Sequence, residues 1–86
     1  MSLLSSNDFK VLGDALRKHH YITLERTLGN VRVEARTIAL LPPWQKEFGI
    51  QMRVWCYGTL WLQTFDNVDA ARRMVKEVLS EQINSF

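Results

Sequence analysis

The chain has 86 residues, 47% of them hydrophobic and 23% charged, and this composition excludes an intrinsically disordered chain. Its length fits one globular domain, expected to cover residues 1–86, and is too short for two. Eleven basic against nine acidic side chains give a net charge of +2, far from the strongly basic composition of a dedicated nucleic-acid binder.

Cysteine usage and hydropathy predict a cytoplasmic protein without membrane contact. Cys56 is the single cysteine, so no internal disulfide can form and nothing points to an oxidising compartment. Residues 1–9 lack the basic start and the long apolar run of a signal peptide. The longest stretch without charge, Val54 to Phe65, is about half of the roughly 20 residues needed to cross a bilayer.

The first predicted element is a helix over residues 6–19. Ser5 and Asp8 have the spacing of a capping box, in which each side chain accepts a hydrogen bond from the other residue's backbone. An apolar stripe at helical spacing predicts that one face of this helix is buried. The stripe is formed by Phe9, Leu12 and Leu16.

A β-hairpin is predicted next, because the apolar period changes to two after the helix. The dipeptide Gly29-Asn30 stands between two β-rich runs, a pattern typical of a two-residue turn. This turn places Glu25 opposite Glu34, which is unfavourable for two like charges alone. Arg32 and Arg36 lie diagonally within reach and are expected to offset the repulsion.

A loop and two more strands follow the hairpin. Pro42 and Pro43 end the second strand, because proline cannot donate a hydrogen bond to a sheet ladder. Apolar and polar residues then alternate over residues 50–57, Gly58 marks a turn, and residues 59–65 form a fourth strand. The inward-facing set of the third strand is predicted to be Ile50, Met52, Val54 and Cys56.

The last predicted element is a helix capped by Asp66, with Asp69 three residues later. Arg73 is spaced four residues from both Asp69 and Glu77, which predicts ion pairs on the exposed side of the helix. The buried stripe is predicted to contain Val68, Ala71, Val75, Val78, Leu79 and Ile83.

These elements predict an α+β fold of order α-β-β-β-β-α. The four strands form an antiparallel meander sheet, and an N-terminal and a C-terminal helix cover it in a two-layer arrangement. Each helix has only one apolar stripe, so each covers the same face of the sheet and leaves its other side in water.

No catalytic, cofactor or metal site is predicted. Cys56 shares its parity with Met52 and Val54, which places its thiol in the core, where thiols are usually inert. His19 and His20 are adjacent and point about 100° apart at a helix end, so they cannot chelate one ion. An enzyme whose site assembles from distant residues is the alternative.

The functional prediction concerns the face of the sheet that the helices leave open. Successive side chains of a strand point to opposite faces, so Arg53, Trp55 and Tyr57 are predicted to point outward. Arg32 and Arg36 flank them from the second strand. Large aromatic side chains with arginine are the residues in which interaction surfaces are enriched.

The fourth strand contributes different residues to this face in two registers. A three-residue loop turns Trp61 outward, whereas a two-residue turn exposes Leu60 and Leu62 instead. The competing interpretation is that Trp44 and its loop fold back over the patch. The candidate partner-binding residues are Arg32, Arg36, Arg53, Trp55, Tyr57 and Trp61.

A protein partner, or a second copy of this chain, is the favoured ligand of this surface. An aromatic sheet surface edged with arginine is also a workable stacking platform for single-stranded nucleic acid. Glu25 and Glu34 share the face and would repel phosphates, whereas a protein interface tolerates them. Nucleic acid is therefore the alternative partner, and neither a membrane nor a small-molecule cofactor is expected.

One segment, Leu60–Ala71, resembles the last strand and the helix start of apetala-type and integrase-arm DNA-binding domains. In those families a small antiparallel sheet presents arginine and tryptophan to a groove of DNA. The resemblance covers only that segment of the 86 residues, and it implies DNA contact through the sheet.

Overall fold

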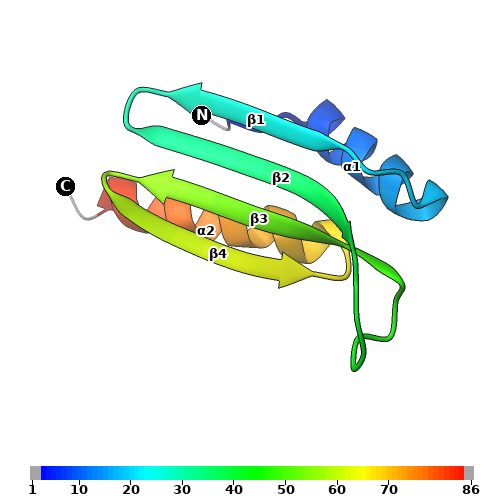
Figure 1. Ribbon diagram of the computed structural model, residues 1–86. Helices are drawn as coiled ribbons and strands as arrows, with labels where there is room; N and C mark the ends of the chain where they lie inside the picture. The colour runs from blue at the N-terminus through cyan, green and yellow to red at the C-terminus, as the bar shows by residue number, and fades with distance from the viewer. Residues whose placement is uncertain (1–2, 85–86) are drawn as a thin grey trace.

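The computed structural model describes the backbone of residues 3–84 and the side chains of residues 3–79 (Figure 1). Its elements are α1 (Ser6–Lys18), β1 (Thr23–Leu28), β2 (Val31–Ala39), β3 (Phe48–Cys56), β4 (Thr59–Phe65) and α2 (Val68–Asn84). The strands form one antiparallel sheet in the order β1-β2-β3-β4. The predicted α+β meander of order α-β-β-β-β-α is confirmed.

The predicted capping box starts α1. The Oγ of Ser5 accepts a hydrogen bond from the Asp8 amide at 3.1 Å, and the Asp8 carboxylate accepts one from the Ser5 amide at 2.9 Å. The second carboxylate oxygen of Asp8 accepts a hydrogen bond from Arg26 at 3.1 Å, which ties the start of α1 to β1. The helix ends at Lys18, and His19 forms its C-cap in the left-handed conformation.

The first hairpin has the register that the Gly29-Asn30 pair predicts. Leu28 pairs with Val31, and Glu25 lies opposite Glu34. Gly29 has a φ of 60°, a conformation that a two-residue hairpin turn requires and that glycine adopts without strain. The turn therefore determines which side chains of β1 and β2 point to each face of the sheet.

The second hairpin resolves the register of β4. Tyr57 and Gly58 both have positive φ, 49° and 85°, which is the signature of a two-residue type I′ turn. Cys56 consequently pairs with Thr59, and Trp61 lies opposite buried Val54 on the helix-covered face. The prediction that Trp61 points outward is therefore wrong, because a two-residue turn gives it the parity of the core.

The cap of α2 is Asn67 and not the predicted Asp66. The Ala70 amide donates to the side-chain oxygen of Asn67 at 2.8 Å, while the Asn67 amide group donates to the Asp66 carboxylate at 3.0 Å. Asp66 thus orients the cap instead of forming it. The two predicted ion pairs of Arg73 do not form in the described part of the chain, and Ile83 lies outside the described side chains. Neither helix, as described, is both long and apolar enough to cross a bilayer.

The core lies between the helices and one face of the sheet, here called the inner face. Cys56 is 1% exposed on this face, which confirms its predicted place in the core. The opposite face, here called the outer face, carries no helix (Figure 1). The fully buried residues of the inner face and of the helices include Val33, Ala35, Ile50, Met52, Val54, Leu12 and Ala71.

The loop between β2 and β3 does not cover the outer face. Its ends are joined by a hydrogen bond from the Leu40 amide to the Glu47 carbonyl at 2.8 Å. The loop projects beyond the end of the sheet, and its Trp44 is 43% exposed (Figure 1). The competing interpretation, in which Trp44 folds back over the aromatic patch, is contradicted by this course of the loop.

Candidate binding surface on the outer face

The outer face is an ordered grid of side chains, because the registers of the three strand pairs align them in rows. The rows run from β1 to β4 and are Thr27-Arg32-Trp55-Leu60, Glu25-Glu34-Arg53-Leu62 and Thr23-Arg36-Gln51-Thr64. Both glutamates and two of the three arginines of this grid lie on β1 and β2, whereas its apolar side chains, Trp55, Leu60 and Leu62, lie on β3 and β4. The face is therefore polarised across the strands.

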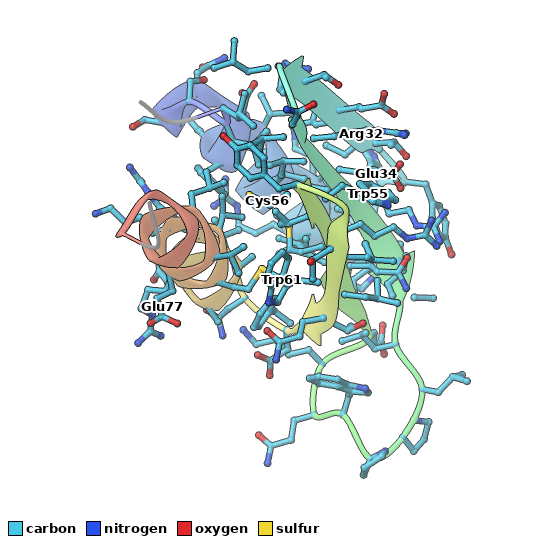
Figure 2. All side chains as sticks on the ribbon, turned by 90° about the vertical axis from the view of Figure 1, so that its left-hand side faces the viewer. Arg32, Glu34, Trp55, Cys56, Trp61 and Glu77 are labelled. Carbon is cyan, nitrogen blue, oxygen red and sulfur yellow. The ribbon has the colours of Figure 1, made fainter. Side chains whose placement is uncertain are left out.

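Arg32 holds the charged side together. Its guanidinium contacts Glu25 at 2.8 Å and Glu34 at 3.5 Å, so it offsets part of their repulsion as the sequence predicts, whereas Arg36 contacts neither glutamate. The same guanidinium lies over the indole of Trp55, 4.6 Å from the ring centre (Figure 2). A cation above an aromatic face is attracted by the ring quadrupole, so the contact also fixes the orientation of Trp55.

The other two arginines of the outer face differ in what they contact. The Nε of Arg36 donates to the side-chain oxygen of Gln51 at 2.8 Å across the β2–β3 pair. Arg53 lies between Glu34 and Leu62 in the grid, but it forms no ion pair with any described residue. Its Nε is buried without a hydrogen-bond partner. The Nε of Arg32 is buried without a partner in the same way, so Arg53 is distinguished by its position beside Leu62 and by the absence of an ion pair with any described residue.

The apolar side consists of three large side chains at neighbouring grid positions. Leu60 and Leu62 are 49% and 52% exposed, and Trp55 between them and Arg32 is half-buried. Leucines this exposed on adjacent same-face positions form a contiguous apolar patch, not isolated surface residues. From the sequence, exposed Leu60 and Leu62 were only one of two alternative registers of β4. The two-residue length of the Tyr57-Gly58 turn selects this register.

Four of the six predicted binding residues share the outer face, namely Arg32, Arg36, Arg53 and Trp55. Tyr57 was expected to extend β3, but it occupies the first central position of the turn, where its side chain is 55% exposed at the end of the sheet. It lies beside the surface instead of within it. Trp61 packs against the core on the inner face.

A cavity of about 550 Å³ lies on the other side of the molecule, where the end of α1, the β2–β3 loop and the start of α2 meet. Charges of both signs line it, including Arg17, Lys46, Glu47 and Asp66. The imidazole of His19 stacks on Phe48 with ring centres 5.1 Å apart. Mixed charge and an aromatic wall give this cavity no single ligand chemistry.

Nucleophilic and metal-binding groups do not gather elsewhere in the described residues. Burial raises the pKa of the Cys56 thiol, which disfavours the reactive thiolate. Within residues 3–79, no three His, Cys, Asp or Glu side chains are arranged to hold a metal ion. The outer face is the surface with the most coherent chemistry.

Comparisons with protein-family models, with curated proteins and with solved structures find no match to this chain. The DNA-binding families that Leu60–Ala71 resembles are therefore not among the matches either. Within that segment, Trp61 belongs to the core, so the residue that would present an indole to DNA faces the helices.

Proposed function

We propose that the protein is a non-catalytic binding module that docks a segment of another protein on the outer face of its sheet. The observation that carries this proposal is the apolar patch of Trp55, Leu60 and Leu62 beside Arg53. A desolvated aromatic and aliphatic centre with arginine at its border is the composition found at the energetic centres of protein interfaces.

The grid also indicates the chemistry of the docked segment. Apolar side chains would cover Leu60 and Leu62, since half of each leucine is exposed to water. A carbonyl oxygen would accept hydrogen bonds from the guanidinium of Arg53, which forms no ion pair with any described residue. Glu25, Glu34 and Arg32 together carry one net negative charge next to Arg53, so an uncharged oxygen suits this position better than a carboxylate.

Single-stranded nucleic acid fits the same face less well. Arg32, the arginine that contacts Trp55, is already shared by two glutamates and has little charge to offer a phosphate. Its guanidinium also covers one face of the indole on which a base would stack. Two leucines in place of further aromatic or basic residues favour a protein ligand.

Capture from the native cell extract, with bound proteins identified by mass spectrometry, tests this proposal. Trp55→Ala and Arg53→Ala should each lose a partner that the unmodified protein retains. Val11→Ala is the matched control, because Val11 is 40% exposed on α1, away from the outer face. A partner retained by Trp55→Ala and Arg53→Ala would show that the outer face does not bind it.

A second arm measures binding of a labelled single-stranded oligonucleotide by fluorescence anisotropy at low and moderate salt. The proposal predicts no binding, or weak binding unaffected by Trp55→Ala. Tight binding that weakens steeply with salt and is lost with Arg53→Ala would show that the ligand of this face is nucleic acid and not protein.

A further inference from the structure

The β4 strand is an open sheet edge without the features that normally keep an edge unpaired. It is the last strand of the sheet, and its sequence TLWLQTF contains neither a charged residue nor a proline. Figure 1 shows it along one border of the sheet, with α2 behind it. Edge strands of monomers usually carry charges, prolines or bulges, because an uncharged edge offers its backbone to another strand.

The opposite edge, β1, shows what protection looks like in this molecule. Its sequence TLERTL carries Glu25 and Arg26 at the middle of the strand. If two copies paired through β1 about its centre, the two Glu25 side chains would face each other, and like charges directly opposite are destabilising. At the equivalent place in β4 stands Leu62.

The turn before β4 determines which backbone groups face the open edge. The residues that flank a two-residue hairpin turn, Cys56 and Thr59, form a hydrogen-bonded pair, and such pairs alternate along an antiparallel ladder. The backbones of Thr59, Trp61, Gln63 and Phe65 therefore bond to β3. The amides and carbonyls of Leu60, Leu62 and Thr64 point away from the sheet.

We propose that β4 pairs with β4 of a second copy of this chain, antiparallel and centred on Leu62, so that two four-stranded sheets become one continuous sheet. In this register Leu62 faces Leu62 of the second copy, and Leu60 faces Thr64. Every outward amide and carbonyl of these three residues then finds a partner, because these pairs fall on the hydrogen-bonded positions. The contact is two-fold symmetric and closed.

Charges on α2 are complementary across the same two-fold axis. Leu62 lies three residues before the end of β4 at Phe65, a distance of about 10 Å at ~3.4 Å per residue. Val75 lies seven residues after the start of α2 at Val68, also about 10 Å at ~1.5 Å per residue. Val75 is therefore level with Leu62 along the strand direction. Arg73 and Glu77 stand two residues on either side of Val75. The axis through Leu62 therefore brings Arg73 of one copy towards Glu77 of the other, twice.

These two charges are on the side of α2 that this contact requires. Arg72 points towards α1, where its guanidinium lies 5.3 Å from the ring centre of Phe9. Figure 2 shows Glu77 on the side of α2 away from α1. Arg73 and Glu77 are exposed, share one helix face, and form no ion pair with another described residue. Both are available to a second copy.

The pairing goes beyond the proposed function and does not depend on it. It leaves the outer face open and brings the two Leu62 side chains side by side at the centre of the enlarged sheet, with one Leu60 diagonally on either side. The apolar patch is thereby doubled into one strip with a Trp55 at each end. A partner that binds this strip would meet a two-fold symmetric surface.

Two measurements on the intact protein test the pairing. Light scattering should show the molar mass rising with concentration from 10.1 kDa towards twice that value. Amide hydrogen exchange on the dimer should protect Leu60, Leu62 and Thr64, while Thr23, Glu25 and Thr27 at the β1 edge exchange freely. A mass of 10.1 kDa up to millimolar concentration, or a dimer with unprotected β4 amides, would overturn the pairing.

Variants separate backbone pairing from side-chain effects. Leu62→Pro removes an outward amide that β3 does not use, so it should abolish the dimer, and circular dichroism should show the monomer folded. Leu62→Thr removes the same leucine but keeps the amide, and it should dimerise. Equal dimerisation of both variants would contradict the pairing, as would loss of the dimer in both.

Charge exchange on α2 provides a test that cannot be mistaken for misfolding, because both residues are exposed. Arg73→Glu should weaken dimerisation by roughly three- to tenfold, and adding Glu77→Arg should restore it. If Arg73→Glu leaves dimerisation unchanged, the proposed two-fold axis is wrong. Since Arg73 lies away from the outer face, Arg73→Glu should still capture a protein partner if the proposed function holds, and loss of that capture alone would leave the pairing standing.

Discussion

The two faces of the sheet are built from the same strands but have opposite physical characters. Along β3, Met52, Val54 and Cys56 are at most 1% exposed, whereas the intervening Arg53 and Trp55 remain partly open to water. The inner face is mostly apolar and covered by helices, and the outer face is polarised from ion pairs to leucines. Alternation along one strand thus separates the residues of the core from those of the proposed binding surface.

Two tryptophans make this contrast most clearly. Trp55 and Trp61 lie on neighbouring strands and on opposite faces. Trp61 packs against the core under α2, while Trp55 lies under the guanidinium of Arg32 (Figure 2). The same residue type therefore packs in the core in one place and belongs to the proposed binding surface in the other.

The largest expected difference between the faces is in the loss of stability when an aliphatic side chain is replaced by alanine. Ile50→Ala removes a side chain that is 0% exposed and should lower the free energy of unfolding by about 2–5 kcal/mol, because it leaves a cavity. Leu62→Ala, at a residue that is 52% exposed, should cost less than about 1 kcal/mol. Guanidinium unfolding of both variants measures this, and equal losses would erase the distinction between the faces.

The contribution of ion pairs to the free energy of unfolding should also differ between the faces, but by less than that of the aliphatic side chains. Asp8→Ala breaks the capping box of α1 and the contact with Arg26, and should cost about 1–2 kcal/mol. Glu25→Ala removes an exposed partner of Arg32 and should cost less than about 0.5 kcal/mol. Thermal unfolding compares the two, and a Glu25→Ala loss as large as that of Asp8→Ala would mean that the outer ion pairs support the fold.

The smallest effect is expected in the pH dependence of stability. Burial raises the pKa of Cys56 in the folded protein above its ordinary value of 9.0, so the unfolded chain loses this proton first as pH rises. The contribution is present below pH 9.0 and is lost as the pH rises above it. Cys56→Ala should lack this part of the decline. Identical pH profiles of the two proteins from pH 8 to 10 would place the thiol at the surface.

The sequence could predict the inner face better than the outer one. A capping box, a Gly29-Asn30 turn and apolar alternation along β3 each have one structural solution, and all three formed as predicted. The strand TLWLQTF is apolar on both parities, so alternation alone could not choose between Trp61 and the leucines. Only the backbone conformation of Tyr57 and Gly58 decides the register.

Long-range contacts account for what else the sequence left open. The neighbouring pair Asp66 and Asn67 offers two competent caps, and their mutual hydrogen bond decides which one forms it. Arg32 contacts two glutamates and Trp55 together, whereas Arg53 has no ionic partner among the described residues. This difference depends on side-chain conformations across three strands. Residue types and spacing do not encode that division of contacts.

The central claim is that the outer face binds without holding the fold together, and Trp55→Ala tests it most directly. Unfolding and partner binding are measured on the same purified variant, with Trp61→Ala as its counterpart. The account predicts that Trp55→Ala changes the free energy of unfolding by no more than about 1 kcal/mol, the scale of its cation–π contact, and weakens binding at least about tenfold. A loss of stability as large as that of Trp61→Ala, about 2–4 kcal/mol, with binding intact would contradict it.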